Sequence, residues 1–160
     1  IGAIAGRNVD HLFDPERKTA IHQWHVDNGA EFEDVGQWKR PHYFPQKNEN
    51  IHDAVNRECR AVRNSLGIID ASTLGKIDLQ GPDVAKFLNL IYTNAWSKLE
   101  VGSCRYGLMC NEHGMVFDDG VTTRISENRY HMTTTTGGAA RVMSWLEEFL
   151  QTEWLDMEVF

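Results

Sequence analysis

The strongest constraint on the fold is a run of three strand-like segments between Cys104 and Thr136. CRYGLMC, MVFDDGVTTRI and YHMTTTT are rich in β-branched and aromatic residues, and the short turns NEHG and SENR separate them. Consecutive strands joined by such short turns pair in antiparallel fashion. We therefore expect a three-stranded antiparallel meander.

Amphipathic patterns flank this meander. Apolar residues recur at spacings of three and four from Ile51 to Leu66, where Gly67 offers a helix stop. IIDASTLGKIDLQG predicts a strand, and GPDVAKFLNLIYTN predicts a helix with Pro82 in its first turn. GGAARVMSWLEEFLQ predicts a further helix, and WLDMEVF is strand-like. This order predicts an α+β fold, an antiparallel or mixed sheet with helices packed on one face.

Residues 1–48 differ from the rest of the chain. They hold three of the four prolines, Pro15, Pro41 and Pro45, together with many aromatic residues, and neither the helical nor the strand period lasts. We expect a linker and aromatic-rich wrapping segment at 1–48, and the first part of a larger domain at 49–160. Because the sequence lacks an initial Met and stops inside a strand-like segment, we expect a piece of a longer chain.

Composition excludes several classes of protein. The 160 residues carry 16 Lys and Arg against 23 Asp and Glu, a net charge of −7 without a basic cluster, so nucleic acid is not an expected partner. Apolar runs are too short to span a bilayer, so no membrane partner is expected. The three cysteines lack C-x-x-C spacing, which indicates neither a disulfide framework nor a zinc ribbon and favours a cytoplasmic location.

Two adjacent carboxylates, Asp118 and Asp119, lie inside a predicted strand. Side chains alternate along a strand, so the two point to opposite faces. Asp119 shares its row with Met115, Phe117, Val121 and Thr123, and the preceding strand places Tyr106 in a similarly apolar row. We therefore expect Asp119 to face inward, either paired with a buried group or facing a ligand, and Asp118 to be solvated or to stabilise a turn, unless a bulge at Gly120 exchanges them.

Two other patterns carry weaker signals. His22 and His25 are three residues apart and His42 follows, but no H-E-x-x-H pattern is present, so we expect ordinary surface or core histidines and no metal. TTTTGG, from Thr133 to Gly138, joins a strand to a helix, where hydroxyls and free N–H groups serve either as an ordinary cap or as a contact to an anionic ligand.

Taken together, LGIIDASTLGKIDLQGPDVAKFLNLIYTN and GSCRYGLMCNEHGMVFDDGVTTRI resemble the folate-binding module of the glycine-cleavage T-protein (aminomethyltransferase) family. The positions that correspond to the family motifs are Asp70, Ser72, Leu74, Gly75, Gly81, Pro82, Asp83, Tyr106, Met109, Gly114, Asp118 and Asp119. The opening segment, FDPERKTAIHQWHVDNGAEFEDVGQWKRPHYF, is similar to the α subunits of heterotetrameric sarcosine oxidases, in which residues 1–8 would end a linker.

The resemblance implies tetrahydrofolate as the ligand, with Asp119 at the reactive edge of the pterin and as the catalytic acid or base. It implies folate contacts from Tyr106 and Leu74, and we assign Thr135 and Thr123 to the same binding surface. FAD or FMN and NAD would bind elsewhere in the parent complex, whose other subunits are the expected partners.

Departures from the T-protein pattern favour one branch of the family over the other. Thr73 and Leu74 replace a His-Met pair, and Thr135 replaces an Asn. These changes favour an oxidoreductase in which folate captures the one-carbon unit from sarcosine as 5,10-methylenetetrahydrofolate, while the isolated segment is expected to be inactive. The alternatives are the aminomethyltransferase of glycine cleavage, or a folate-free scaffold that docks onto a partner subunit.

Overall fold

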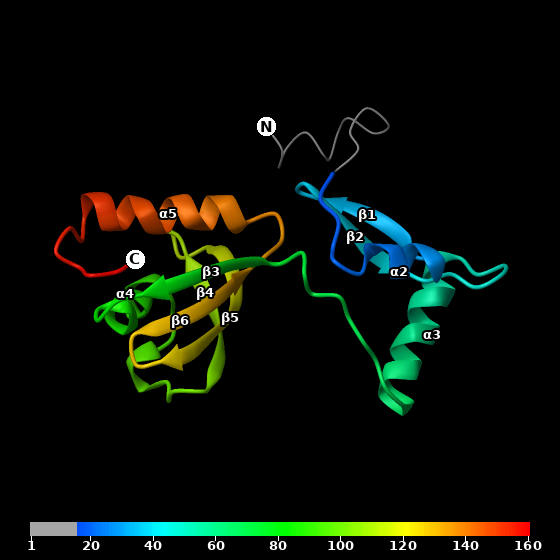
Figure 1. Ribbon diagram of the computed structural model, residues 1–160, viewed down its shortest axis with the longest axis horizontal. Coiled ribbons are helices and arrows are strands. Elements are labelled where there is room, and N and C mark those ends of the chain that lie inside the picture. Colours follow the sequence, from blue (N-terminus) through cyan, green and yellow to red (C-terminus); the bar gives the residue numbers. More distant parts are fainter. Residues whose placement is uncertain (1–15) are drawn as a thin grey trace. The chain divides into compact units, whose positions relative to one another are not determined.

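The computed structural model describes residues 16–160, which divide into two compact units between Thr73 and Leu74 (Figure 1). The expectations for Pro15 and for a linker tail at residues 1–8 lie outside the described residues. Within residues 16–160, no helix combines the length and the apolar character that crossing a membrane requires. The predicted boundary at residue 48 stays a prediction.

The first unit contains more regular structure than its sequence pattern indicates. Helix α2 spans His22–Asp27, the antiparallel hairpin of β1 (Glu31–Val35) and β2 (Trp38–Tyr43) turns at Gly36 with φ of 60°, and helix α3 spans Ile51–Asn64. The short elements before α3 explain why no period lasts long enough to be seen in the sequence.

Helix α3 confirms the predicted helix and starts at a strong cap. The Asn50 side chain accepts hydrogen bonds from the backbone N–H groups of His52 and Asp53, at 2.9 and 3.1 Å. Arg57 pairs with Glu49 at 2.8 Å and also donates to the Phe44 carbonyl oxygen at 2.7 Å. These bonds fasten the helix to the segment that follows β2.

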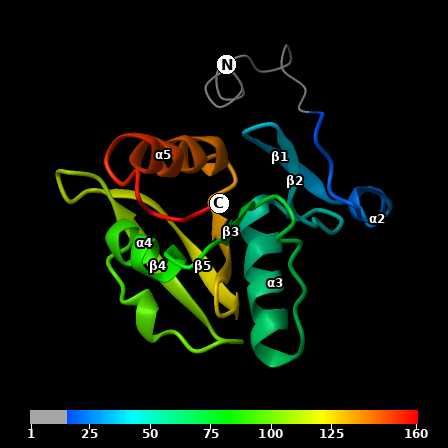
Figure 2. The ribbon, with the colours of Figure 1, turned by 60° about the vertical axis from the view of Figure 1, so that its left-hand side comes forward.

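The second unit is a four-stranded antiparallel sheet with two helices. Its elements are β3 (Gly75–Gln80), α4 (Val84–Ile91), the short 3₁₀ helix η2 (Trp96–Lys98), β4 (Cys104–Cys110), β5 (Val116–Ser126), β6 (Arg129–Thr134) and α5 (Ala139–Thr152). The strand order is β3-β6-β5-β4, and the unit is seen from two directions in Figure 1 and Figure 2. The predicted meander, its flanking helices and the α+β fold class are confirmed.

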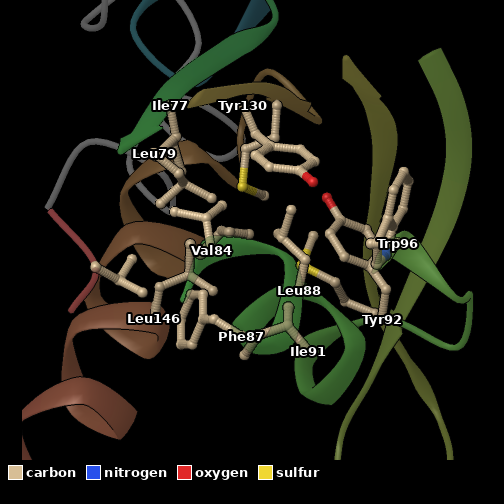
Figure 3. Packing of buried hydrophobic residues seen from close by; sticks show 14 of the residues in the cluster. Ile77, Leu79, Val84, Phe87, Leu88, Ile91, Tyr92, Trp96, Tyr130 and Leu146 are labelled. Carbon is tan, nitrogen blue, oxygen red and sulfur yellow. The ribbon is translucent and has the colours of Figure 1, made fainter. Parts of the chain in front are cut away.

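The hydrophobic core lies against one face of this sheet, which we call the core face. Side chains from α4 and α5 meet those of the strands, as Figure 3 shows for Val84, Leu88, Tyr130 and Leu146. On β3 the buried residues alternate with exposed ones, so that Ile77 and Leu79 point into the core. We call the opposite face the open face.

The last segment does not form the predicted strand. Residues 153–160 contain turns and irregular backbone. Gln80 and Phe160 nevertheless exchange two backbone hydrogen bonds, at 2.8 and 2.7 Å. The segment therefore pairs with the edge of β3 at one point only.

Candidate functional site

The two adjacent aspartates lie on opposite faces of β5, as alternation requires, but the predicted assignment of faces is wrong. Asp118 is buried, with 3% of its surface exposed, and points to the core face. Asp119 is half-buried and lies on the open face with Tyr106, which is 55% exposed. The buried glycines at 107 and 120 and the buried Met109 share the core face with Asp118.

A β-bulge at Phe117 explains the reversal. Asp118 pairs with Met109 and Val116 pairs with Cys110, so Phe117 has no partner residue on β4. The Phe117 ring packs on the core side against Trp145 of α5, with ring centroids 4.7 Å apart. Because the bulge interrupts the alternation, Phe117 and Asp118 both face α5, and every residue after them is shifted by one face.

Asp119 and Tyr106 form a hydrogen-bonded pair on the open face. The Tyr106 hydroxyl donates to Asp119 Oδ2 at 2.9 Å. This hydrogen bond to a carboxylate raises the pKa of Tyr106, with smaller contributions from desolvation and from the charge of Asp119. The pair therefore offers a carboxylate with one free oxygen and a phenol ring side by side, both within reach of a ligand.

Two further predicted site residues share the open face. Thr123 lies two residues beyond Val121 on β5, and its paired neighbours are Cys104 on one side and His131 on the other. Leu74 lies in a bend immediately before β3 and is half-buried; continuing the alternation of β3 by one residue would put it on the side of Lys76. Thr123 thus comes from β5 and Leu74 from the residue before β3, whereas Tyr106 comes from β4.

Thr135 lies apart from this group, beside Asp118. Its backbone N–H donates to Asp118 Oδ1 at 3.0 Å, and its hydroxyl donates to Asp118 Oδ2 at 2.9 Å. The helix α5 that follows begins at Ala139, and its N-cap residue, Gly138, provides no side-chain cap. The Thr135 hydroxyl therefore hydrogen-bonds to the buried carboxylate of Asp118. The sequence pattern TTTTGG did not reveal this role.

His22 of the first unit is held by ring packing, and His25 by a buried carboxylate. His25 Nε2 lies 2.9 Å from Asp70 Oδ2, and both side chains are almost fully buried. Burial opposes ionisation of Asp70, but hydrogen bonds, with Ser72 first and His25 among them, hold the pKa of its carboxyl well below its usual range. His22 packs against Phe32, and burial, with Lys18 nearby, lowers the pKa of His22.

Among residues 16–160, no three His, Cys, Asp or Glu side chains are grouped in a way that could hold a metal ion. The spacing of His22, His25 and His42 therefore does not produce a metal centre in the part of the chain that the structure describes.

The fold and the sequence place the chain in a known class. Residues 21–160 match the family described as the GCVT N-terminal domain, so the chain belongs to this T-protein family. The fold also matches a solved structure, the glycine cleavage system aminomethyltransferase T from Bartonella henselae, with a TM-score of 0.70 and 22% identity over 90% of this chain and 37% of that one. The family resemblance read from the sequence is confirmed.

Within this class the sequence is similar to subunits of sarcosine oxidases. It is 60% identical over 157 residues to the sarcosine oxidase subunit alpha of Corynebacterium sp. (strain U-96) and 46% identical over 159 residues to that of Rhizobium meliloti. These matches cover 98% and 99% of this chain, and the chain spans 16% of each relative. The aminomethyltransferase of Corynebacterium jeikeium is 33% identical over 143 residues, 89% of this chain and 34% of that protein.

Proposed function

We propose that these residues are the tetrahydrofolate-binding part of a sarcosine oxidase α subunit, working with other subunits in the cytoplasm. The observation that carries the proposal is the Tyr106–Asp119 pair on the open face of a T-protein sheet. The identity of 60% to sarcosine oxidase subunits alpha supports the oxidase branch. FAD or FMN and NAD would bind in other parts of that complex.

The open face suits a flat ligand with polar edges. Tyr106 and its paired neighbour Val121 are 55% and 37% exposed, and they form an apolar strip across two strands. The Asp119 carboxylate lies beside this strip and hydrogen-bonds to Tyr106. A pterin ring presents a planar π system and N–H groups, which such a strip and carboxylate complement. Thr123 and Leu74 extend the same surface.

Tetrahydrofolate would supply the nucleophilic N5 that captures the one-carbon unit, an iminium left by oxidation of sarcosine at a flavin elsewhere. Formation of the methylene bridge removes a proton from N5 and another from N10, and the departing glycine nitrogen takes up two protons. Asp119 would accept and deliver these protons, since it carries a free oxygen at an accessible site. Tyr106 would hold the carboxylate in place.

Isothermal titration calorimetry of the full subunit with tetrahydrofolate tests the proposal. We expect binding that Asp119→Asn weakens about tenfold or more, because a charged hydrogen bond contributes about 1.5–3 kcal/mol. Glu147→Gln, on the exposed side of α5, is the control and should leave the affinity unchanged. Binding that is equally strong in the Asp119→Asn variant would contradict the proposal.

Aminomethyl transfer is a second candidate, favoured by the 33% identity to the aminomethyltransferase of Corynebacterium jeikeium. Sarcosine labelled with ¹³C in its methyl group distinguishes the two. The oxidase proposal predicts labelled 5,10-methylenetetrahydrofolate from the complete complex. An aminomethyltransferase would leave the sarcosine label unchanged.

A further inference from the structure

Asp118 is the most fully bonded buried carboxylate of the second unit. Its side chain is completely buried, and Oδ1 accepts hydrogen bonds from the backbone N–H groups of Asp119, at 2.8 Å, and Thr135, at 3.0 Å. Oδ2 accepts the Thr135 hydroxyl at 2.9 Å. A buried carboxylate with three donors is well satisfied, and its removal would leave those donors without partners.

These bonds join two segments that are distant in sequence. Asp119 follows the bulge of β5, and Thr135 begins the turn from β6 into α5. The Asp118 carboxylate thus binds two backbone segments: β5 immediately after the bulge, and the turn between β6 and α5.

Arg141 of α5 completes the arrangement from the helix side. Its Nη2 donates to the Phe117 carbonyl oxygen at 2.6 Å and lies 4.0 Å from Asp118 Oδ2. Its guanidinium carbon lies 4.3 Å from the centre of the Phe117 ring. The unpaired bulge residue is therefore held through both its carbonyl group and its ring.

The space around the Asp118 carboxylate is filled to contact. A Cβ atom on Gly138 would overlap Asp118 Oδ2. Only glycine fits this position without movement of the neighbouring atoms. The Asp118 carboxylate is therefore packed tightly against the turn that leads into α5.

We infer that Asp118 is a positioning residue for Asp119: by fastening the bulged strand to the turn before α5, it directs the Asp119 carboxylate to the open face and toward Tyr106. The two adjacent acids then have separate roles. Asp119 contacts the ligand, whereas Asp118 contacts only the protein. The consequence for binding rests on the proposed function, while the consequence for the Tyr106–Asp119 pair does not.

A double-mutant cycle on the full subunit tests the inference by calorimetry with tetrahydrofolate. We expect Asp118→Ala and Asp119→Ala each to weaken binding about tenfold or more, and the double variant to bind no more weakly than Asp119→Ala alone, because both changes remove one function. Asp118→Asn keeps an oxygen for the two backbone donors and should bind within about threefold of the unchanged protein. If the double variant weakens binding by the product of the two single-variant factors, the inference is overturned.

Two further variants separate positioning from general loss of stability. Gly138→Ala displaces the Asp118 carboxylate without removing it, and its effect on binding should also vanish in the Asp119→Ala background. Val142→Ala removes buried apolar volume from α5 and should lower the melting temperature without changing the affinity. If Val142→Ala weakens binding as much as Asp118→Ala does, positioning by Asp118 is refuted.

A measurement without ligand distinguishes failure of the inference from failure of the proposed function. The pKa of the Tyr106 hydroxyl is raised because the hydroxyl donates a hydrogen bond to the Asp119 carboxylate. Asp118→Ala should move the Tyr106 pKa back toward the ordinary value of about 10, as seen by NMR of ¹³Cζ-labelled tyrosine, even if tetrahydrofolate does not bind. An unchanged Tyr106 pKa in Asp118→Ala would overturn the inference.

Discussion

The two faces of the sheet use the same kinds of residue for different purposes. On the core face, apolar side chains are fully buried and the one carboxylate, Asp118, has all its bonds satisfied within the protein. On the open face, Tyr106 and Val121 are exposed, and among the described residues the Asp119 carboxylate has one hydrogen-bond partner, the Tyr106 hydroxyl. The Asp118 carboxylate is therefore satisfied within the protein, whereas the open face keeps exposed polar and apolar groups.

The largest expected difference between the faces is in the cost of removing a leucine. Leu88 of α4 is fully buried, so Leu88→Ala should lower the free energy of unfolding by about 2–5 kcal/mol. Leu108 is only half-buried, and Leu108→Ala should cost less than half as much. Urea denaturation of the two variants measures both values. Equal costs would show that the open face is packed as a second core.

The second largest difference is expected between the effects on stability of replacing the two adjacent aspartates. Asp118→Ala leaves two backbone N–H groups and a hydroxyl without their acceptor. We expect a cost of about 2–4 kcal/mol, because one buried unsatisfied group costs about 1–3 kcal/mol and the costs of neighbouring groups are not additive. Asp119→Ala frees only the exposed Tyr106 hydroxyl and should change stability by less than about 1 kcal/mol. The same denaturation experiment decides this, and a reversed order would contradict the assignment of faces.

A buried carboxylate in the first unit gives a test by pH. The pKa of Asp70 lies below its unfolded value, so its stabilising contribution is present above about pH 4 and is lost as the pH falls further. We expect a loss of about 1–3 kcal/mol of stability below pH 4 in the unchanged protein. Asp70→Asn should show a flatter dependence on pH over that range. A steeper dependence in Asp70→Asn would reverse the sign of this contribution.

The smallest effect concerns the tyrosines on the two faces. Asp119→Asn removes the carboxylate to which Tyr106 donates, so the Tyr106 pKa should fall toward about 10. Tyr92 lies in the core, where burial, the largest cause, raises the pKa of its hydroxyl to about 12, and this value should remain high. NMR titration of ¹³Cζ-labelled tyrosine, with Tyr106→Phe to assign the signal, separates the two.

Much of the fold was accessible from the sequence because it depends on local patterns. The apolar spacing of α3, the alternation of β3 and the turn residues Asn111 and Gly114 each specify an element through its neighbours in the chain. The family resemblance was also carried by local motifs, and it singled out Asp119 and Tyr106 as separate site residues, which the structure joins by a hydrogen bond. Their function as ligand contacts stays a prediction.

The choice of faces was not accessible in this way. Both rows of β5 contain apolar residues, since Val121 lies on the open face and Phe117 on the core face, so hydrophobicity alone did not mark the core. Gly120 suggested a bulge at that position, but the bulge lies at Phe117. A phenylalanine gives no indication of a bulge in the sequence. The role of Thr135 was missed for the same reason, because its partner Asp118 is seventeen residues away.

By itself the sequence determined the order of helices and strands from α3 to α5, the family, and the placement of two neighbouring acids on opposite sides of a strand. Each of these follows from local motifs and spacing along the chain. Tertiary structure alone decided which acid is buried. A single unpaired residue reverses alternation, and only the packing of Phe117 against Trp145, together with the bonds from Thr135 to Asp118, makes that reversal favourable.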